Sequence, residues 1–280
     1  MMMNNMHKID INLKKRIIKH PKFNTNINLD ITDTIMAYND GKVWKIIPLD
    51  VLLRYPIIYD KYYDRTNTKK GHYIISDITI TYCPFSGCGM VYFGKFVPTN
   101  KVYNNNIVLT DKNNNNILVQ MTGRMYNKQL KQIEYGFLRR EEAKIFTLRN
   151  AISKYPDCLF LTHSTNIHLG PIVEHNYTKN EKIIYPLKYT STKYHPKTLV
   201  YGIEYKSRYS ENTENDNKYS VIVSDDASKD KINSRDYNKT KYNVYFSKMM
   251  DKIRERGGII IPSYWFAWYN MFPNTKVIKL

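Results

Sequence analysis

Two cysteines lie close together in the most apolar stretch of the chain, at a spacing that could serve metal binding or disulfide exchange. The stretch runs from Ile78 to Phe96 and reads ITITYCPFSGCGMVYFGKF, with four residues between Cys83 and Cys88. Thiolates in a turn are good zinc ligands and good nucleophiles. Alternating apolar residues on both sides predict two strands, so we expect the cysteines to lie at the turn of a β-hairpin.

A zinc site at this hairpin would need two further ligands from elsewhere in the chain. His163 and His168 are the candidates, together with Cys158, the third cysteine of the sequence. The spacing of the hairpin cysteines suits a zinc knuckle better than thioredoxin-like exchange. The competing interpretation is that both cysteines fill a tight, buried hairpin, because free cysteine is among the most buried residue types. We favour this core interpretation and keep zinc, bound by Cys83, Cys88, His163 and His168, as the alternative.

A second cluster that could bind a ligand is Trp265-Phe266-Ala267-Trp268, near the end of the chain. Exposed aromatic rings at this density can stack on nucleic-acid bases. However, the rings occur at helical spacing just before Pro273, and large aromatic side chains are mostly buried. We therefore predict that this segment is a helix in the core.

The chain is strongly basic, with a formal charge of +18 from 43 Lys and Arg against 25 Asp and Glu. Such an excess attracts nucleic acid or an acidic protein surface. The alternative is that an A/T-rich genome places Lys, Asn, Ile and Tyr wherever a surface position is free. The densest basic cluster, opposed only by Asp10, comprises Lys8, Lys14, Lys15, Arg16, Lys19 and Lys22.

The cysteine count and the hydropathy pattern indicate where the protein is found. Three cysteines in 280 residues do not make a disulfide scaffold, which favours a reducing compartment. The beginning, MMMNNMHKID, lacks the apolar core of a secretory signal, and no window reaches the length of a membrane span. We expect a soluble protein of the host cytoplasm or a virion, neither secreted nor membrane-spanning.

The pattern of elements predicts an α+β fold, mainly antiparallel β with a few short helices. Alternating apolar runs and Asn- or Gly-containing turns dominate, and helical spacing is confined to 48–54, 141–155, 247–255 and 264–271. Residues 1–30 are polar and basic and are expected to form an N-terminal arm. Residues 31–280 are expected to form one β-rich domain.

Two stretches of the chain share a plan, which predicts two related halves. FTLRNAISKYPDCLFL (146–161) and YWFAWYNMFPNTKVIKL (264–280) each contain an aromatic start, a helical segment, a proline and an alternating strand. Pro156 and Pro273 occupy corresponding positions. We therefore expect related halves at 31–165 and 195–280, each closed by a helix–Pro–strand unit.

The cysteine segment TYCPFSGCGMVYF resembles the Tyr-Cys-Pro-Leu-Cys signature of a family known only as a domain of unknown function. Four further matches follow in the family's order, at 110–130, 154–162, 195–205 and 263–278. They include Asp111, Gln120, Gly123, Pro196, Val200, Gly202 and the WFAW segment followed by Pro-Asn-Thr. The cysteine spacing departs from the family's Cys-x-x-Cys, and Leu118 replaces its Trp. The resemblance implies a β-rich single domain and no particular reaction.

Together these observations predict a basic protein with a non-enzymatic structural or binding role. Asn, Ile, Lys and Tyr have A/T-rich codons, and asparagine forms runs at 104–106 and 113–116. This codon bias, the Asn runs and the family resemblance suit a protein carried in the virion of a large DNA virus. The alternative is a metal- or thiol-dependent enzyme centred on Cys83 and Cys88.

Overall fold

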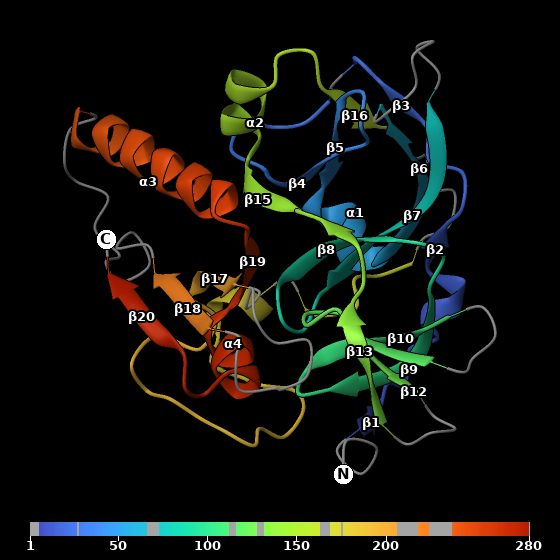
Figure 1. Ribbon diagram of the computed structural model, residues 1–280, viewed down its shortest axis with the longest axis vertical. Helices are drawn as coiled ribbons and strands as arrows, with labels where there is room; N and C mark the ends of the chain where they lie inside the picture. Colours follow the sequence, from blue (N-terminus) through green and yellow to red (C-terminus); the bar gives the residue numbers. More distant parts are fainter. Residues whose placement is uncertain are drawn as a thin grey trace.

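Strands dominate the computed structural model of the protein, which is described here for nine ranges of the chain. These ranges are 6–26, 28–65, 73–111, 116–127, 132–162, 169–174, 176–205, 218–223 and 237–279. Within them the strands form four sheets in a propeller-like arrangement (Figure 1). The prediction of a mainly antiparallel β fold with a few short helices is confirmed.

The first two sheets lie next to each other on the right of Figure 1. One has the order β1 (Met6–Lys8), β9 (Val97–Tyr103), β10 (Asn106–Thr110), β11 (Asn116–Val119), β12 (Arg124–Asn127), β13 (Gln132–Phe137). The other has the order β14 (Arg140–Glu141), β8 (Cys88–Phe93), β7 (Ile74–Cys83), β6 (Ile57–Asp64), β2 (Ile17–Ile18). The β7–β8 hairpin is buried along its inner half because other sheets cover it on both faces.

The other two sheets carry most of the helices. The third has the order β15 (Lys144–Thr147), β4 (Thr34–Asn39), β5 (Trp44–Pro48), β16 (Leu159–Leu161), β3 (Phe23–Asn24). The fourth has the order β19 (Gly258–Tyr264), β17 (Leu199–Tyr205), β18 (Lys218–Val223), β20 (Lys276–Lys279). The α-helices are α1 (Leu49–Arg54), α2 (Leu148–Lys154), α3 (Tyr237–Glu255) and α4 (Trp265–Met271).

Three of the short helices end in the same way, with an aromatic residue followed by proline. The backbone N–H groups of Tyr55, Tyr155 and Phe272 each donate to the carbonyl four residues earlier. Their φ values are −125°, −135° and −133°, because a following proline disfavours helical geometry in the preceding residue. The strand that follows each proline, β6, β16 or β20, pairs in parallel with a neighbour. The helix–Pro–strand unit, predicted at two places in the sequence, therefore occurs at three places in the structure.

The prediction of a helix over 141–155 is wrong for the first half of that range. Residues Lys144–Thr147 are strand β15, which pairs antiparallel with β4, and the helix begins only at Leu148. The segment KIFT contains Ile, Phe and Thr, which favour strands, and the open edge of β4 provides the hydrogen-bond partners. In contrast, α3 begins ten residues before the expected 247, at Tyr237.

The segment expected as a basic arm is built into the sheets. Strand β1 pairs with β9, β2 with β6 and β3 with β16, and a 3₁₀ turn, η2 (Leu13–Lys15), joins the first two. Ile9, Leu13 and Ile18 are buried, so this segment contributes apolar side chains to the core. Its lysines occupy exposed positions.

No helix within the described ranges combines the length and the apolar character needed to cross a membrane.

Candidate functional site

The two hairpin cysteines face each other across the end of the β7–β8 ladder. Cys83 is the last residue of β7 and Cys88 the first of β8, and they are register partners. The N–H of Gly87 donates to the carbonyl of Cys83 at 2.9 Å and closes the turn. Gly87 has φ +66°, and a Cβ there would lie within 3 Å of the Tyr264 ring. The turn therefore requires glycine, and the predicted hairpin is present.

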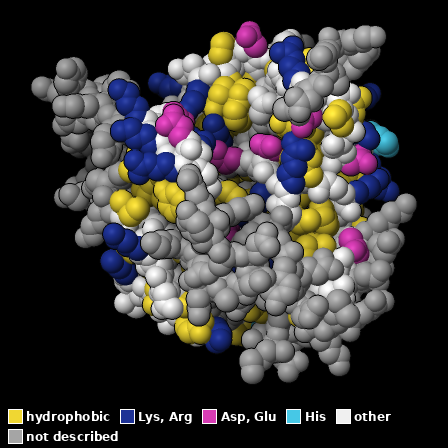
Figure 2. Space-filling view, viewed as in Figure 1, with side chains coloured by type: hydrophobic (Ala, Val, Ile, Leu, Met, Phe, Trp, Pro, Cys, Tyr) yellow, Lys and Arg dark blue, Asp and Glu magenta, His cyan; other side chains and the backbone are white. Residues whose placement is uncertain are grey.

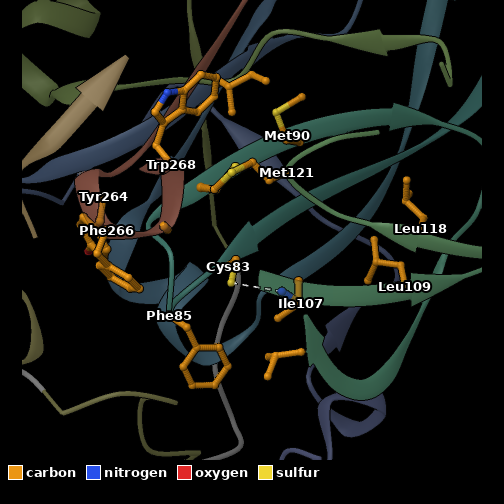
Figure 3. Close-up of a cluster of buried hydrophobic side chains, with 14 of the residues drawn as sticks. Cys83, Phe85, Met90, Ile107, Leu109, Leu118, Met121, Tyr264, Phe266 and Trp268 are labelled. Carbon is orange, nitrogen blue, oxygen red and sulfur yellow. Dashed lines mark hydrogen bonds between the residues drawn. The ribbon is translucent and has the colours of Figure 1, made fainter. Parts of the chain in front are cut away.

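Both thiols lie in the hydrophobic core. Cys83 and Cys88 have no exposed surface, and both belong to the largest buried cluster of the described residues (Figure 3). The sulfur of Cys83 accepts a hydrogen bond from the N–H of Ile107 at 3.4 Å and donates to the carbonyl of Asn105 at 3.5 Å. Burial raises the pKa of both thiols. They are therefore held as neutral thiols, which are weak nucleophiles and weak metal ligands.

Two of the four predicted zinc ligands, Cys83 and Cys88, lie within the described residues. His163 and His168 lie outside the described residues. Cys158 is buried in a different cluster, with Ile35 and Phe160, and is not part of the cluster around Cys83. The described ranges contain no group of three or more His, Cys, Asp or Glu that could hold a metal ion. The four-ligand set remains a prediction.

A buried network of amides and hydroxyls surrounds the cysteine turn. The Asn106 amide donates to Ser86 Oγ at 2.9 Å and to Gln120 Oε1 at 2.8 Å. The Gln120 amide donates in turn to Thr81 Oγ1 and to the carbonyl of Cys88, both at 3.0 Å. These polar groups satisfy one another, and they link β7 and β8 to β10 and the end of β11. Because satisfied buried networks fix a unique arrangement, we interpret this one as structural.

Next to this network lies a buried ion pair that we did not anticipate from the sequence. Arg140 Nη2 donates to the Glu204 carboxylate, and the two side chains are 2% and 1% exposed. Arg140 Nη1 also donates to the carbonyl of Thr122 at 3.1 Å. Although burial disfavours the charged guanidinium, Glu204 outweighs it and raises the pKa of Arg140. The pair joins β14 to β17, which belong to different sheets.

The aromatic segment forms helix α4 and lies in the hydrophobic core, as predicted. Trp265 and Trp268 are 1% and 0% exposed, and the indole of Trp268 donates to Thr275 Oγ1 at 3.0 Å. The rings of Trp268 and Phe272 pack with centroids 4.5 Å apart. These rings are therefore not available to stack on an external ligand.

Five lysines of the first 22 residues, carried on or next to β1, η2, β2 and β3, are together called the N-terminal basic surface. Each is exposed, and they are Lys8, Lys14, Lys15, Lys19 and Lys22. Arg16 differs from them, because its guanidinium donates to the carbonyls of Arg54 and Gly170 at 3.1 and 2.7 Å. The charged groups of this surface are thus carried on structured backbone and point away from the core.

The fold and the site define a β-rich protein with sheets in a propeller-like arrangement and a buried cysteine hairpin. A family model described as "Protein of unknown function (DUF3179)" matches residues 17–260, and the chain belongs to that family. No curated protein and no solved structure matches the chain.

Proposed function

We propose that this protein acts by binding nucleic acid, and that the N-terminal basic surface contacts the phosphates. The observation that carries this proposal is the exposure of all five lysines, with Asp10 as the one acidic residue between Lys8 and Lys22. Lysine provides a mobile point charge that pairs with phosphate without a demanding geometry. This suits binding that depends on the phosphate backbone and not on base sequence.

The burial of the cysteines supports a binding role over a catalytic one. A thiol enzyme needs an accessible sulfur with a lowered pKa, whereas burial raises the pKa of Cys83 and Cys88. The metal- or thiol-dependent enzyme remains the second candidate, favoured by the direct register pairing of the two cysteines. The codon bias and the family resemblance support a place in the virion of a large DNA virus, where nucleic acid is abundant.

Replacing the five lysines of this surface by glutamine is expected to weaken DNA binding by tenfold or more. Neutralised phosphates release counterions, so the slope of log affinity against log salt concentration should become shallower by about 4.5 if each lysine contacts one phosphate of duplex DNA. The measurement is fluorescence anisotropy with a labelled 20-base-pair duplex at several salt concentrations. Wild-type protein should show the steeper slope.

The matched control replaces five other exposed lysines: Lys95, Lys179, Lys182, Lys188 and Lys193. Both variants lose the same number of positive charges. A larger loss of DNA affinity in the first variant would therefore show that the N-terminal basic surface itself contacts DNA. Equal losses of affinity in both variants, or DNA binding that ignores salt, would contradict the proposal. Binding to polyglutamate with no binding to DNA would instead identify an acidic protein as the partner.

A further inference from the structure

A cleft of about 330 Å³ opens between α2 and β15 on one side and α3 on the other. Figure 1 shows α2, β15 and α3 next to one another, and Figure 2 shows Lys and Arg side chains beside hydrophobic ones over the same region. The volume lies at the lower end of the range for small-molecule sites. The cleft uses none of the lysines of the N-terminal basic surface.

Polar contacts across the cleft hold its two walls in place. Arg254 of α3 binds the Glu142 carboxylate through two N–H groups, at 2.5 and 2.7 Å. Arg254 also donates to Asp251 at 2.7 Å, so its charge is neutralised within the protein. Lys154 of α2 donates to Ser247 Oγ of α3 at 3.1 Å. These contacts leave the walls fixed while the space between them stays open.

Lys144, on β15, is the partly buried lysine of this cleft, whereas Lys154 is exposed. Its ammonium donates to Tyr155 Oη at 2.8 Å and lies 4.6 Å from the centre of the Trp44 ring. No carboxylate of the described residues lies within ion-pair distance of Lys144. Burial lowers the pKa of Lys144 to about 8. A partly buried ammonium without a counter-ion is costly, and a bound anion would relieve that cost.

The charged groups near Lys144 do not supply this counter-ion. Glu142 and Asp251 favour its charged form at longer range, but both carboxylates bind Arg254. Arg254 and Lys154 oppose the charge of Lys144. An external anion would therefore meet a net positive environment.

The wall of the cleft formed by β17, α3 and β19 carries several apolar side chains. Tyr201, Phe246, Met250, Ile260 and Pro262 line it, contributed by β17, α3 and β19. Such a surface favours a ligand with an aromatic or alkyl body, because burial of apolar area stabilises the complex by roughly 25 cal/mol per Å². One partly buried ammonium suits a single negative charge, whereas a phosphate dianion would need more N–H donors.

We propose that this cleft binds a small organic carboxylate, with its carboxylate at Lys144 and its apolar body against Phe246 and Met250. The probe is 4-phenylbutyrate, measured by isothermal titration calorimetry on the full-length protein. Its amide, 4-phenylbutanamide, has the same body without the charge and should bind at least tenfold more weakly. Lys144→Met keeps the aliphatic stem and should weaken 4-phenylbutyrate binding by tenfold or more, the effect of losing one charged hydrogen bond.

Lys95→Met is the matched control, because Lys95 is exposed and lies 4.9 Å from the centre of the Tyr59 ring, outside the cleft. It should leave the affinity unchanged. Lys154→Met, at an exposed position, provides a second cleft variant and should also weaken binding. The proposal is overturned if 4-phenylbutyrate does not bind, if acid and amide bind equally, or if the cleft variants and Lys95→Met behave alike. Binding of phenyl phosphate without binding of 4-phenylbutyrate would also overturn the carboxylate assignment.

Discussion

Glu204→Gln is expected to lower the free energy of unfolding by about 3–5 kcal/mol, the usual cost of breaking a buried ion pair. The substitution preserves the shape of the side chain and removes only its charge. The guanidinium of Arg140 is 2% exposed and cannot lose its proton, so it would stay charged after the loss of the Glu204 carboxylate. Urea denaturation followed by circular dichroism measures the change directly.

Two controls separate the buried charge from a general effect of substitution. Asp77→Asn removes the carboxylate of the Lys61–Asp77 pair, whose side chains are 53% and 57% exposed, and should leave the unfolding midpoint almost unchanged. The double variant Arg140→Met with Glu204→Met removes both charges and should recover most of the stability lost by Glu204→Gln. If the double variant is less stable than Glu204→Gln, an uncompensated charge is not the cause of the loss.

Gly202→Ala is expected to destabilise the protein by about 3 kcal/mol, at the upper end of the range for overpacking. Gly202 lies within β17, and a Cβ added there would be 2.0 Å from the indole ring of Trp268. The indole cannot move aside easily, because it has no exposed surface and is held by its hydrogen bond to Thr275. Thermal unfolding followed by circular dichroism would show the loss as a lowered midpoint.

Gly170→Ala is the matched control for this substitution. A Cβ at Gly170 meets nothing within 4 Å, and its backbone does not require glycine. We therefore expect a change of no more than about 0.5 kcal/mol. Equal midpoints for the two alanine variants would show that the close packing of β17 on α4 is not important for stability.

The fold was largely predictable because its strands and short helices are encoded locally. The Tyr-Pro and Phe-Pro ends of α2 and α4 were visible in the sequence as a repeated plan. The helix at 48–54 was predicted as well, but its Tyr55-Pro56 end and the strand after it were not recognised as a third copy of this plan. Strand β15 was misread as helix because its pairing with β4 joins residues about 110 positions apart. This pairing acts together with the strand preference of Ile, Phe and Thr, and the two outweigh the helical spacing over 141–155.

The candidate sites were less predictable than the fold. The cysteine hairpin was recognisable from its residues, but its burial depends on packing against distant segments such as the one that carries Tyr264. Arg140 and Glu204 are separated by 64 residues, and nothing in their local sequence marks them as partners. Lys144 likewise looks like any other lysine of this lysine-rich chain. Its setting arises only in the folded protein, where the Trp44 ring and the Tyr155 hydroxyl contact its ammonium.

The central claim is that the cysteine hairpin is a structural part of the core and that binding takes place at the surface. The most direct test is labelling of the native protein with iodoacetamide, with each cysteine followed by peptide mass spectrometry. We predict that Cys83 and Cys88 stay unmodified until urea unfolds the protein, because both sulfurs are fully buried as neutral thiols. Rapid labelling of either residue in the native protein, or labelling that begins only when a chelator is added, would contradict the claim.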